Sequence, residues 1–272
     1  MTEAELIART RRPITVDSLA TELAELGTSE GDVVLVHSSL SSLGWVNGGA
    51  VAVVQALIQA VGESGTIVMP SQSWQISDPI KWMRPEVPED WIQTIRDTMP
   101  MYDRRTTPTR LMGKVVEVFR TWPNSVRSDH PLGSFVARGP QAEALMASHN
   151  LTDPFGETSP LGEMYRLGGV KILLIGVGFD KCTALHYAEC RRWPDRPKMK
   201  EGAPMMVDGV RKWVEYEVPQ ELNSDLFVPV GGSAVAKGIA RRGKLGEGRG
   251  VIVDMRELVD HAVGLWPDEY TR

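Results

Sequence analysis

The chain has 272 residues, of which 42% are hydrophobic and 24% charged, a composition typical of a globular protein with a sizeable core. Its 30 basic and 35 acidic residues give a net charge of −5, which argues against a dedicated nucleic-acid binder. A mild acidic balance is compatible with a cationic small-molecule partner, but charge alone favours an ordinary solvated surface.

Cysteine usage and hydropathy exclude several classes of protein. Cys182 and Cys190 are too few for a disulfide framework, and neither lies in a zinc-binding spacing. The first residues lack the apolar core of a signal peptide, and no run approaches the roughly 18 apolar residues of a membrane span. We therefore expect a cytoplasmic protein without a bound metal and without a membrane or nucleic-acid partner.

The first part of the chain predicts a strand–helix–strand unit. Apolar residues recur at helical spacing over 15–26, between a capping threonine and a glycine, and predict a helix. The continuous apolar runs 33–37 and 66–69 are typical of buried parallel strands. A helix is predicted between them, from about 49 to 61, which completes a βαβ unit.

Residues 71–107, here called the excursion, are rich in proline and tryptophan and show little periodicity. We predict one short helix there, at about 91–97. A loop this long inside a compact domain usually has a function, and we expect it to form the substrate side of a cleft. Regular structure is predicted to resume with a helix at 110–119.

The second half of the chain predicts further alternation of helices and strands. A clear buried strand at 171–175 runs into a glycine-containing turn and a helix that begins near Thr183. A hairpin is predicted over 205–218 with its turn at Asp208 and Gly209. The other predicted elements are helices at 139–149, 160–168, 232–244 and 255–265, and a short strand at 251–253.

Together these elements predict an α/β protein with a mostly parallel central sheet flanked by helices, plus an antiparallel addition. We treat 1–272 as a single domain. Ligands of such sheets bind beyond the carboxyl ends of the strands. That rule selects residues 37–44, 69–74 and 176–189.

His186 and Glu189 are the strongest candidates for chemistry. They follow a buried strand and its glycine turn, and their spacing of three places them on one face of a helix that Thr183 could cap. Histidine titrates near neutrality and suits removal of a proton from an attacking amine. The alternative is a histidine that only bonds backbone at the start of a helix.

Familiar catalytic motifs are absent from the sequence. The GVG at 176–178 lacks the third glycine of a dinucleotide-binding fingerprint. No GxSxG nucleophile elbow and no GxxxxGK[ST] phosphate loop occur, so a serine hydrolase and a P-loop kinase are unsupported.

Weaker candidates are His130, which precedes a proline, and the stiff loop 153–160, which carries Asp153 and Glu157. Taken alone, His130 fits a turn histidine better, whereas the loop fits solvent-exposed turn structure with a helix cap equally well. The serine-rich loop 37–44 could receive phosphate or pantetheine groups through backbone amides. His149 and His261 lie on predicted helices with apolar neighbours, and we expect both to be structural.

Several segments, in this order and over nearly the whole chain, resemble the aminoglycoside 3-N-acetyltransferase family, antibiotic acetyltransferases distinct from the GNAT superfamily. The segments are HSSL at 37–40, TPTRLMG at 107–113, RSDHP at 127–131, SFVARG at 134–139, PFGETSPL at 154–161, LIGVG at 174–178 and TALHYAE at 183–189.

The resemblance implies transfer of an acetyl group from acetyl-CoA to the 3-amino group of a 2-deoxystreptamine ring, without a metal. The oligomeric state stays open between a monomer and a homodimer. The implied catalytic residues are His186 as base, with Glu189, Thr183 and His130. The coenzyme would lie on the loop after the first strand and on the end of the second: His37, Ser38, Ser39, Leu40, Ser41, Gly44, Met69 and Ser71. The substrate amines would meet Asp153, Glu157, Glu215, Glu217 and Trp74.

Other functions stay open at this stage. A thioester or amide hydrolase could use the same histidine on water, and a ligand-binding module could lack catalysis. A family member could also act on a different amine, because the predicted substrate regions 71–107 and 201–228 differ among members. No base is obviously placed to activate Cys182, so we expect direct transfer rather than an acetylated enzyme.

Overall fold

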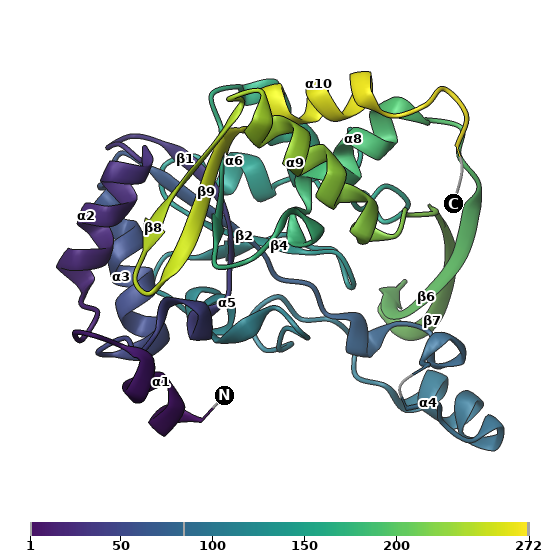
Figure 1. Ribbon diagram of the computed structural model, residues 1–272. Helices are drawn as coiled ribbons and strands as arrows, with labels where there is room; N and C mark the ends of the chain where they lie inside the picture. The colour runs from purple at the N-terminus through teal and green to yellow at the C-terminus, as the bar shows by residue number, and fades with distance from the viewer. Residues whose placement is uncertain (1, 84, 271–272) are drawn as a thin grey trace.

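The computed structural model describes residues 2–83 and 85–270 and shows a seven-stranded sheet between two helical layers, with a separate two-stranded hairpin (Figure 1). The sheet has the order β3-β4-β2-β1-β5-β9-β8. Its strands are β1 (Val33–Ser38), β2 (Thr66–Pro70), β3 (Val126–Arg127), β4 (Phe135–Arg138), β5 (Lys171–Ile175), β8 (Ala240–Leu245) and β9 (Gly248–Asp254).

The predicted α/β class with a mostly parallel sheet is confirmed by the strand directions. β1 pairs in parallel with β2 and with β5, whereas the outer neighbours pair antiparallel. As a result β4 and β9 run against the other five described strands of the sheet. The parallel trio β2-β1-β5 comes from the continuous apolar runs, as expected for strands covered on both faces.

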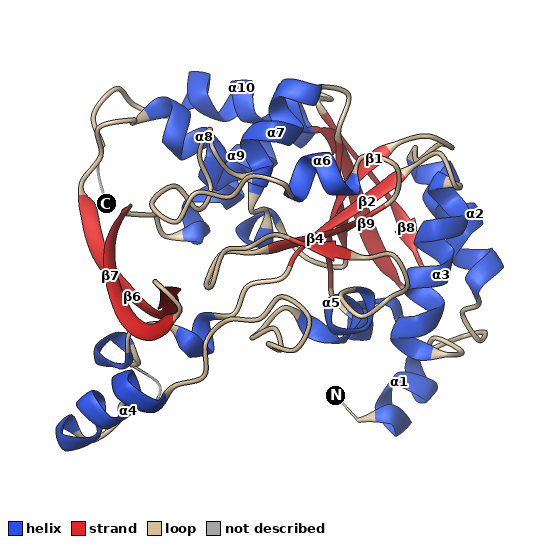
Figure 2. Ribbon diagram, turned by 180° about the vertical axis from the view of Figure 1, so that it is seen from behind, coloured by secondary structure: helices blue, strands red, loops and turns tan. Residues whose placement is uncertain are grey.

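The side chains on the two faces of β1 belong to two hydrophobic cores. Val34 and Val36 pack toward α2 (Val16–Leu26), α3 (Gly49–Val61) and α5 (Gly113–Phe119). Leu35 packs toward the opposite layer, because successive strand residues point to opposite faces. That layer consists of α6 (Ala142–Met146), α7 (Pro160–Leu167), α8 (Ala184–Arg192), α9 (Phe227–Ala236) and α10 (Met255–Leu265) (Figure 2).

Local signals set the helix ends as predicted. The hydroxyl of Thr15 accepts from the amide of Ser18 at the start of α2, and Gly27 ends that helix at a φ of 122°. Ser159 caps α7, which has a proline at its first position and ends at Gly168. α1 (Glu3–Arg9), which we did not predict, has a capping box and no buried residue.

The excursion packs against the hairpin of β6 (Lys198–Val207) and β7 (Val210–Pro219), which stands away from the sheet (Figure 1). α4 (Ile92–Thr98) is the predicted short helix, and the guanidinium of Arg96 lies 5.7 Å from the ring centroid of Trp213. The hairpin turns at Asp208 and Gly209, both with positive φ, as predicted. Short 3₁₀ turns occur at Leu40–Leu43, Trp74–Ile76, Pro79–Lys81, Glu89–Trp91, Phe179–Lys181 and Ser224–Leu226.

A buried arginine anchors the excursion to the sheet. Arg127 is 3% exposed, and its guanidinium donates to the hydroxyls of Ser71, Ser73 and Ser134 and to backbone carbonyls of Ser71 and Thr107. No carboxylate is among these partners, so carbonyl and hydroxyl dipoles compensate the buried charge. Both ends of the excursion are thereby tied to one side chain.

Three predictions about regular structure were wrong. The helix expected at 232–244 ends at Ala236, and 240–245 is the edge strand β8. Two arginines and a lysine of β8 are exposed, so this segment lacks the apolar residues by which a strand is recognised in a sequence. β3 and β4 were missed because they are short, and the helices expected at 110–119 and 139–149 are shorter than predicted.

Within 2–83 and 85–270, no helix has the length and hydrophobicity needed to cross a membrane.

Candidate active site

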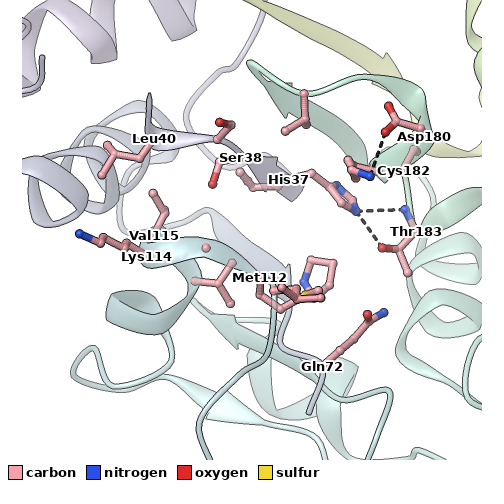
Figure 3. A pocket seen from close by; sticks show the side chains of 18 of the residues that line it. His37, Ser38, Leu40, Gln72, Met112, Lys114, Val115, Asp180, Cys182 and Thr183 are labelled. Carbon is pink, nitrogen blue, oxygen red and sulfur yellow. Dashed lines mark hydrogen bonds and ion pairs between the residues drawn. The ribbon is translucent and has the colours of Figure 1, made fainter. Parts of the chain in front are cut away.

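A cavity of about 630 Å³ opens at the carboxyl ends of β1 and β5 (Figure 3). Its lining comes from the loop after β1, the end of β2, residues 111–116, residues 177–183 and the start of α9, together with Leu6 and His186. Parallel pairing sets Ser38 opposite Ile175, which brings the loops that follow the two strands to one edge of the sheet. The strand-end rule applied to the sequence therefore found the right edge.

His186 lies at the wall of this cavity on α8, with its side chain 15% exposed. Its ring stacks on Phe155 with 5.2 Å between centroids and meets the edge of Phe227 at 4.9 Å. Two aromatic rings thus fix the plane of the imidazole from two sides.

Glu189 fixes the protonation of that imidazole. The carboxylate is fully buried, and its Oε2 lies 2.9 Å from Nδ1 of His186 while Oε1 accepts from the amide of Leu222 at 2.8 Å. An ionised carboxylate only accepts, so Nδ1 carries the proton and Nε2 keeps its lone pair. The spacing of three on one helix turn had predicted this contact from the sequence.

Glu221 is a second carboxylate at the histidine, and it was not predicted from the sequence. Its Oε2 lies 3.8 Å from Nε2 of His186. Burial raises the pKa of Glu221, against the influence of His186. The residue follows the hairpin in an irregular segment, where the sequence carries no periodic signal for its direction.

The charges of the two carboxylates control the histidine. Burial by itself lowers the pKa of His186, but the charges of Glu221 and Glu189 and the hydrogen bond from Glu189 outweigh burial, so the pKa lies above its usual value. A histidine with this pKa can hold a proton it has accepted near neutral pH.

His37 and Thr183 form a second pair in the cavity wall. Nε2 of His37 lies 3.0 Å from both the amide nitrogen and the hydroxyl of Thr183 (Figure 3). Burial, together with the charge of His186, lowers the pKa of His37 to about 3. His37 is therefore a neutral acceptor for Thr183 at working pH.

The predicted coenzyme residues divide into two groups. Ser38, Ser39, Leu40 and Ser41 line the cavity, as His37 does. The hydroxyl of Ser38 is buried and has no hydrogen-bond partner within the described part of the chain, so it is free for a ligand. The amide of Ser39, by contrast, already donates to the carbonyl of Ile175.

Gly44, Met69 and Ser71 do not line the cavity, so the structure does not support the coenzyme contacts expected of them. Met69 is fully buried in the core between the sheet and α3. The hydroxyl and carbonyl of Ser71 are taken by Arg127. Gly44 has a φ of 97°, and a Cβ there would lie 2.8 Å from the hydroxyl oxygen of Thr10.

Two lysines at the cavity were not predicted. Lys114 and Lys181 both line it and are exposed, and the acidic residue beside them, Asp180, lies 3.0 Å from Lys181. The cavity mouth therefore carries a cationic surplus, whereas carboxylates surround His186. The two lysines are far apart in the sequence, which therefore does not predict that they line one cavity.

The predicted substrate carboxylates are mostly engaged elsewhere. Asp153 accepts from the amide and hydroxyl of Thr158, and Glu157 accepts from Tyr187 and pairs with Arg166. Neither lines the cavity. Their part in substrate binding is unsupported, because these contacts stabilise the loop that both residues belong to.

The remaining substrate candidates lie on the hairpin side. Glu215 and Glu217 are exposed on β7, on the opposite face of the strand from buried Tyr216. The indole nitrogen of Trp74 donates to the side chain of Gln72, which itself lines the cavity.

The structure does not support a catalytic role for His130. Its ring is 1% exposed and lies outside the cavity; Nδ1 accepts from the amides of Leu132 and Gly133, and Nε2 lies 3.3 Å from the carbonyl of Leu151. Its ring centroid is 4.5 Å from that of His149. Both rings brace the loop before β4.

Cys182 is buried, and burial holds its thiol pKa well above the usual value, at about 12. A thiol in that state is a poor nucleophile. Across 2–83 and 85–270, no group of three or more histidine, cysteine or acidic residues is arranged to hold a metal ion.

The chain combines this sheet order with a buried histidine–glutamate pair and a cavity at the strand ends. Comparison with known proteins assigns this combination to an α/β acyltransferase. The family model for aminoglycoside 3-N-acetyltransferase matches residues 35–266. The chain belongs to this family, which confirms the resemblance found in its sequence and makes it an enzyme of the acyltransferase class.

Two curated relatives match over nearly their whole length. The SPbeta prophage-derived aminoglycoside N(3')-acetyltransferase-like protein YokD of Bacillus subtilis is 46% identical, over 95% of this chain and 94% of that protein. Aminoglycoside N(3)-acetyltransferase VII of Streptomyces paromomycinus is 33% identical, over 99% and 96%.

Solved structures agree in fold. The crystal structure of YokD has a TM-score of 0.92 at 45% identity and covers 96% of each chain. AAC-IIIb in a binary complex with CoASH has a TM-score of 0.81 at 29% identity, covering 93% of this chain and 96% of that one. AAC-VIa bound to sisomicin has a TM-score of 0.81 at 28% identity, covering 93% and 97%.

Proposed function

We propose that the protein transfers the acetyl group of acetyl-CoA directly to the 3-amino group of a 2-deoxystreptamine aminoglycoside, with His186 as general base, and thereby confers resistance. The observation that carries the proposal is the orientation of His186, whose Nδ1 is held by Glu189 while Nε2 keeps a lone pair at the cavity wall. The CoASH and sisomicin complexes of the structural relatives support the choice of the two substrates.

The charge distribution supports a separate place for each substrate. The cationic mouth formed by Lys114 and Lys181 suits the phosphate groups of the coenzyme, and the unpartnered hydroxyl of Ser38 offers a donor further inside. Glu221 is not among the residues that line the cavity, but its side chain is 30% exposed and its Oε2 lies 3.8 Å from Nε2 of His186, so it suits an ammonium group that approaches the histidine. The two substrates then meet at the histidine, and proximity lowers the barrier.

His186 and its neighbours would act in a fixed sequence. A protonated amine cannot attack a carbonyl, so the ammonium group held by Glu221 first releases one proton to solvent, and Nε2 of His186 takes a second proton as the neutral nitrogen attacks. The hydroxyl of Thr183, which lines the cavity, would donate to the thioester oxygen as negative charge develops there. The imidazolium then returns the proton to the leaving thiolate, while Glu189 stabilises its positive charge throughout.

A second candidate is acetylation of an amine that carries fewer positive charges than an aminoglycoside. The engagement of Asp153 and Glu157 in contacts within the protein favours it, because a polycation needs several free carboxylates. The thioester hydrolase alternative predicts release of CoA without any amine acceptor.

The test is an acceptor screen with acetyl-CoA and a thiol-detecting dye. Aminoglycosides with a free 3-amino group, a matched set already acetylated at that nitrogen, and simple monoamines are compared, and NMR maps the acetylated nitrogen of each product. We expect thiol release only with a free 3-amino group. Release with monoamines alone would favour the second candidate, and release without an acceptor would favour the hydrolase.

A further inference from the structure

Thr183 stands between the turn that follows β5 and the first residue of α8, the helix that carries His186. Its carbonyl accepts from the amide of His186 at 3.0 Å, in the first turn leading into α8. Its side chain does not cap this helix. The position of Thr183 therefore fixes both its own hydroxyl and the start of the helix turn that carries the base.

His37 is what holds Thr183 from the sheet side. The ring stands on β1, opposite Leu174 of β5, and is 7% exposed. Its Nε2 accepts from the amide of Thr183, so Nδ1 carries the proton; Nδ1 has no hydrogen-bond partner within the described residues. The contact joins the end of a central strand of the sheet to the start of α8 across 146 residues of chain.

The two contacts at Nε2 are not equivalent. A neutral imidazole offers one lone pair there, and the backbone amide of Thr183 cannot turn away from it. The hydroxyl can rotate, so it can leave Nε2 for an oxygen in the cavity without stranding an unpaired acceptor. Conversely, the amide of Thr183 is occupied and is not available to the thioester oxygen.

We propose that His37 is a positioning residue, which holds the amide of Thr183 so that the threonine hydroxyl is the mobile donor in the cavity, rather than a contact for the coenzyme. This inference rests on the proposed function, since it assigns the donor for the oxygen of the thioester. It predicts that substitution of His37 lowers the turnover number and leaves the affinity for the coenzyme unaltered.

The kinetic test compares His37→Leu with His37→Gln. Leucine keeps the apolar bulk and removes the acceptor, whereas glutamine can place its Oε1 near the position of Nε2. We expect His37→Leu to lower kcat by about a hundredfold, as small displacements of catalytic groups do, with an unchanged KM for acetyl-CoA. Glutamine should recover most of the loss. A raised KM for acetyl-CoA with unchanged kcat would overturn the inference in favour of direct coenzyme contact.

A double-mutant cycle with Thr183→Val separates positioning from general destabilisation. Valine removes the hydroxyl and keeps the shape, so His37→Leu should cost little more kcat in that background if His37 acts through Thr183. Losses that multiply would contradict the assignment. Thermal melts of all four proteins check that each is folded under assay conditions.

A structural readout keeps this test independent of the acceptor. ¹⁵N NMR of the histidine rings should show His37 protonated at Nδ1 and unprotonated at Nε2 throughout pH 5–9, a range chosen to lie well above its lowered pKa of about 3. The amide of Thr183 should be protected from hydrogen exchange, and should lose that protection in His37→Leu. An Nε2–H tautomer would refute the inference even if no acceptor were found, and failure of the acceptor screen alone would refute only the proposed function.

Discussion

Glu189→Gln is the most informative single change, because Glu189 accepts from two donors and a glutamine has only one side-chain oxygen to accept with. Its Oε1 accepts from the amide of Leu222 and its Oε2 accepts from Nδ1–H of His186. A glutamine has one oxygen and one NH₂ group at those positions. Since the amide of Leu222 can only donate, the oxygen must face it, and the NH₂ group then faces His186.

The consequence is the wrong tautomer of the base. Nδ1 would accept from the glutamine NH₂, the proton would move to Nε2, and the lone pair that takes the proton of the amine would be lost. In the serine-protease triad the corresponding change costs about 10⁴ in kcat. General-base catalysis is worth about 10² to 10⁴, so we expect a loss in kcat of about 10³ to 10⁴ here.

The assay is the pH dependence of kcat for wild type, Glu189→Gln and the matched control Glu221→Gln. Burial, Glu221 and Glu189 together set the pKa of His186, and the two carboxylates raise it. The base must be neutral, so activity rises as pH increases through this pKa. Removing either charge lowers the pKa and should move the rising limb to lower pH.

Only Glu189→Gln should also collapse the plateau, because Glu221 faces Nε2 and does not hold the Nδ1 proton. A Glu189→Gln enzyme within about tenfold of wild type would refute the tautomer argument. A collapse of equal size in both variants would show that charge alone, and not proton placement, is what Glu189 provides.

Three further outcomes are expected. Lys114→Gln combined with Lys181→Gln should raise the KM for acetyl-CoA at low salt and weaken its salt dependence, measured by initial rates at several ionic strengths. Arg127→Ala should lower the free energy of unfolding by about 3 kcal/mol or more in urea titrations, because several buried acceptors lose their donor. The control Lys244→Ala removes an exposed ion pair and should lower it by less than about 1 kcal/mol. Burial lowers the pKa values of three histidines, His37, His130 and His149, to about 3, 4 and 3 from an ordinary 6.5. The stability that these neutral rings contribute should be fully present above pH 6.5 and should decline as pH falls toward the lowered values, by up to about 1.4 kcal/mol per pH unit for each histidine. A denaturation midpoint that stays constant from pH 7 to pH 5 would contradict this.

Much of the fold was predictable because its signals are local. The continuous apolar runs of β1, β2 and β5 and the caps of α2 and α7 act within a few residues of where they occur. The contact of His186 with Glu189 was predictable for the same reason, since one helix turn sets it. β8 was not, because an edge strand with outward charges lacks a strand pattern until β9 pairs with it.

The rest of the site depends on residues that are distant in sequence. Glu221, His37 and the two cavity lysines reach His186 or the cavity from different segments, and nothing local indicates their direction. Asp153 and Glu157 had the right chemistry for a substrate site, but Thr158, Tyr187 and Arg166 occupy them.

The amino-acid sequence was enough to predict the class of the fold, the family, the histidine that we propose as base and the edge of the sheet where the cavity lies, because apolar periodicity, helix caps and matched motifs are properties of short segments. The sequence could not show which charged groups surround His186 and which are neutralised by neighbours. Both depend on burial and on pairing across the chain, which exist only once β1, β5, α8 and the hairpin have come together.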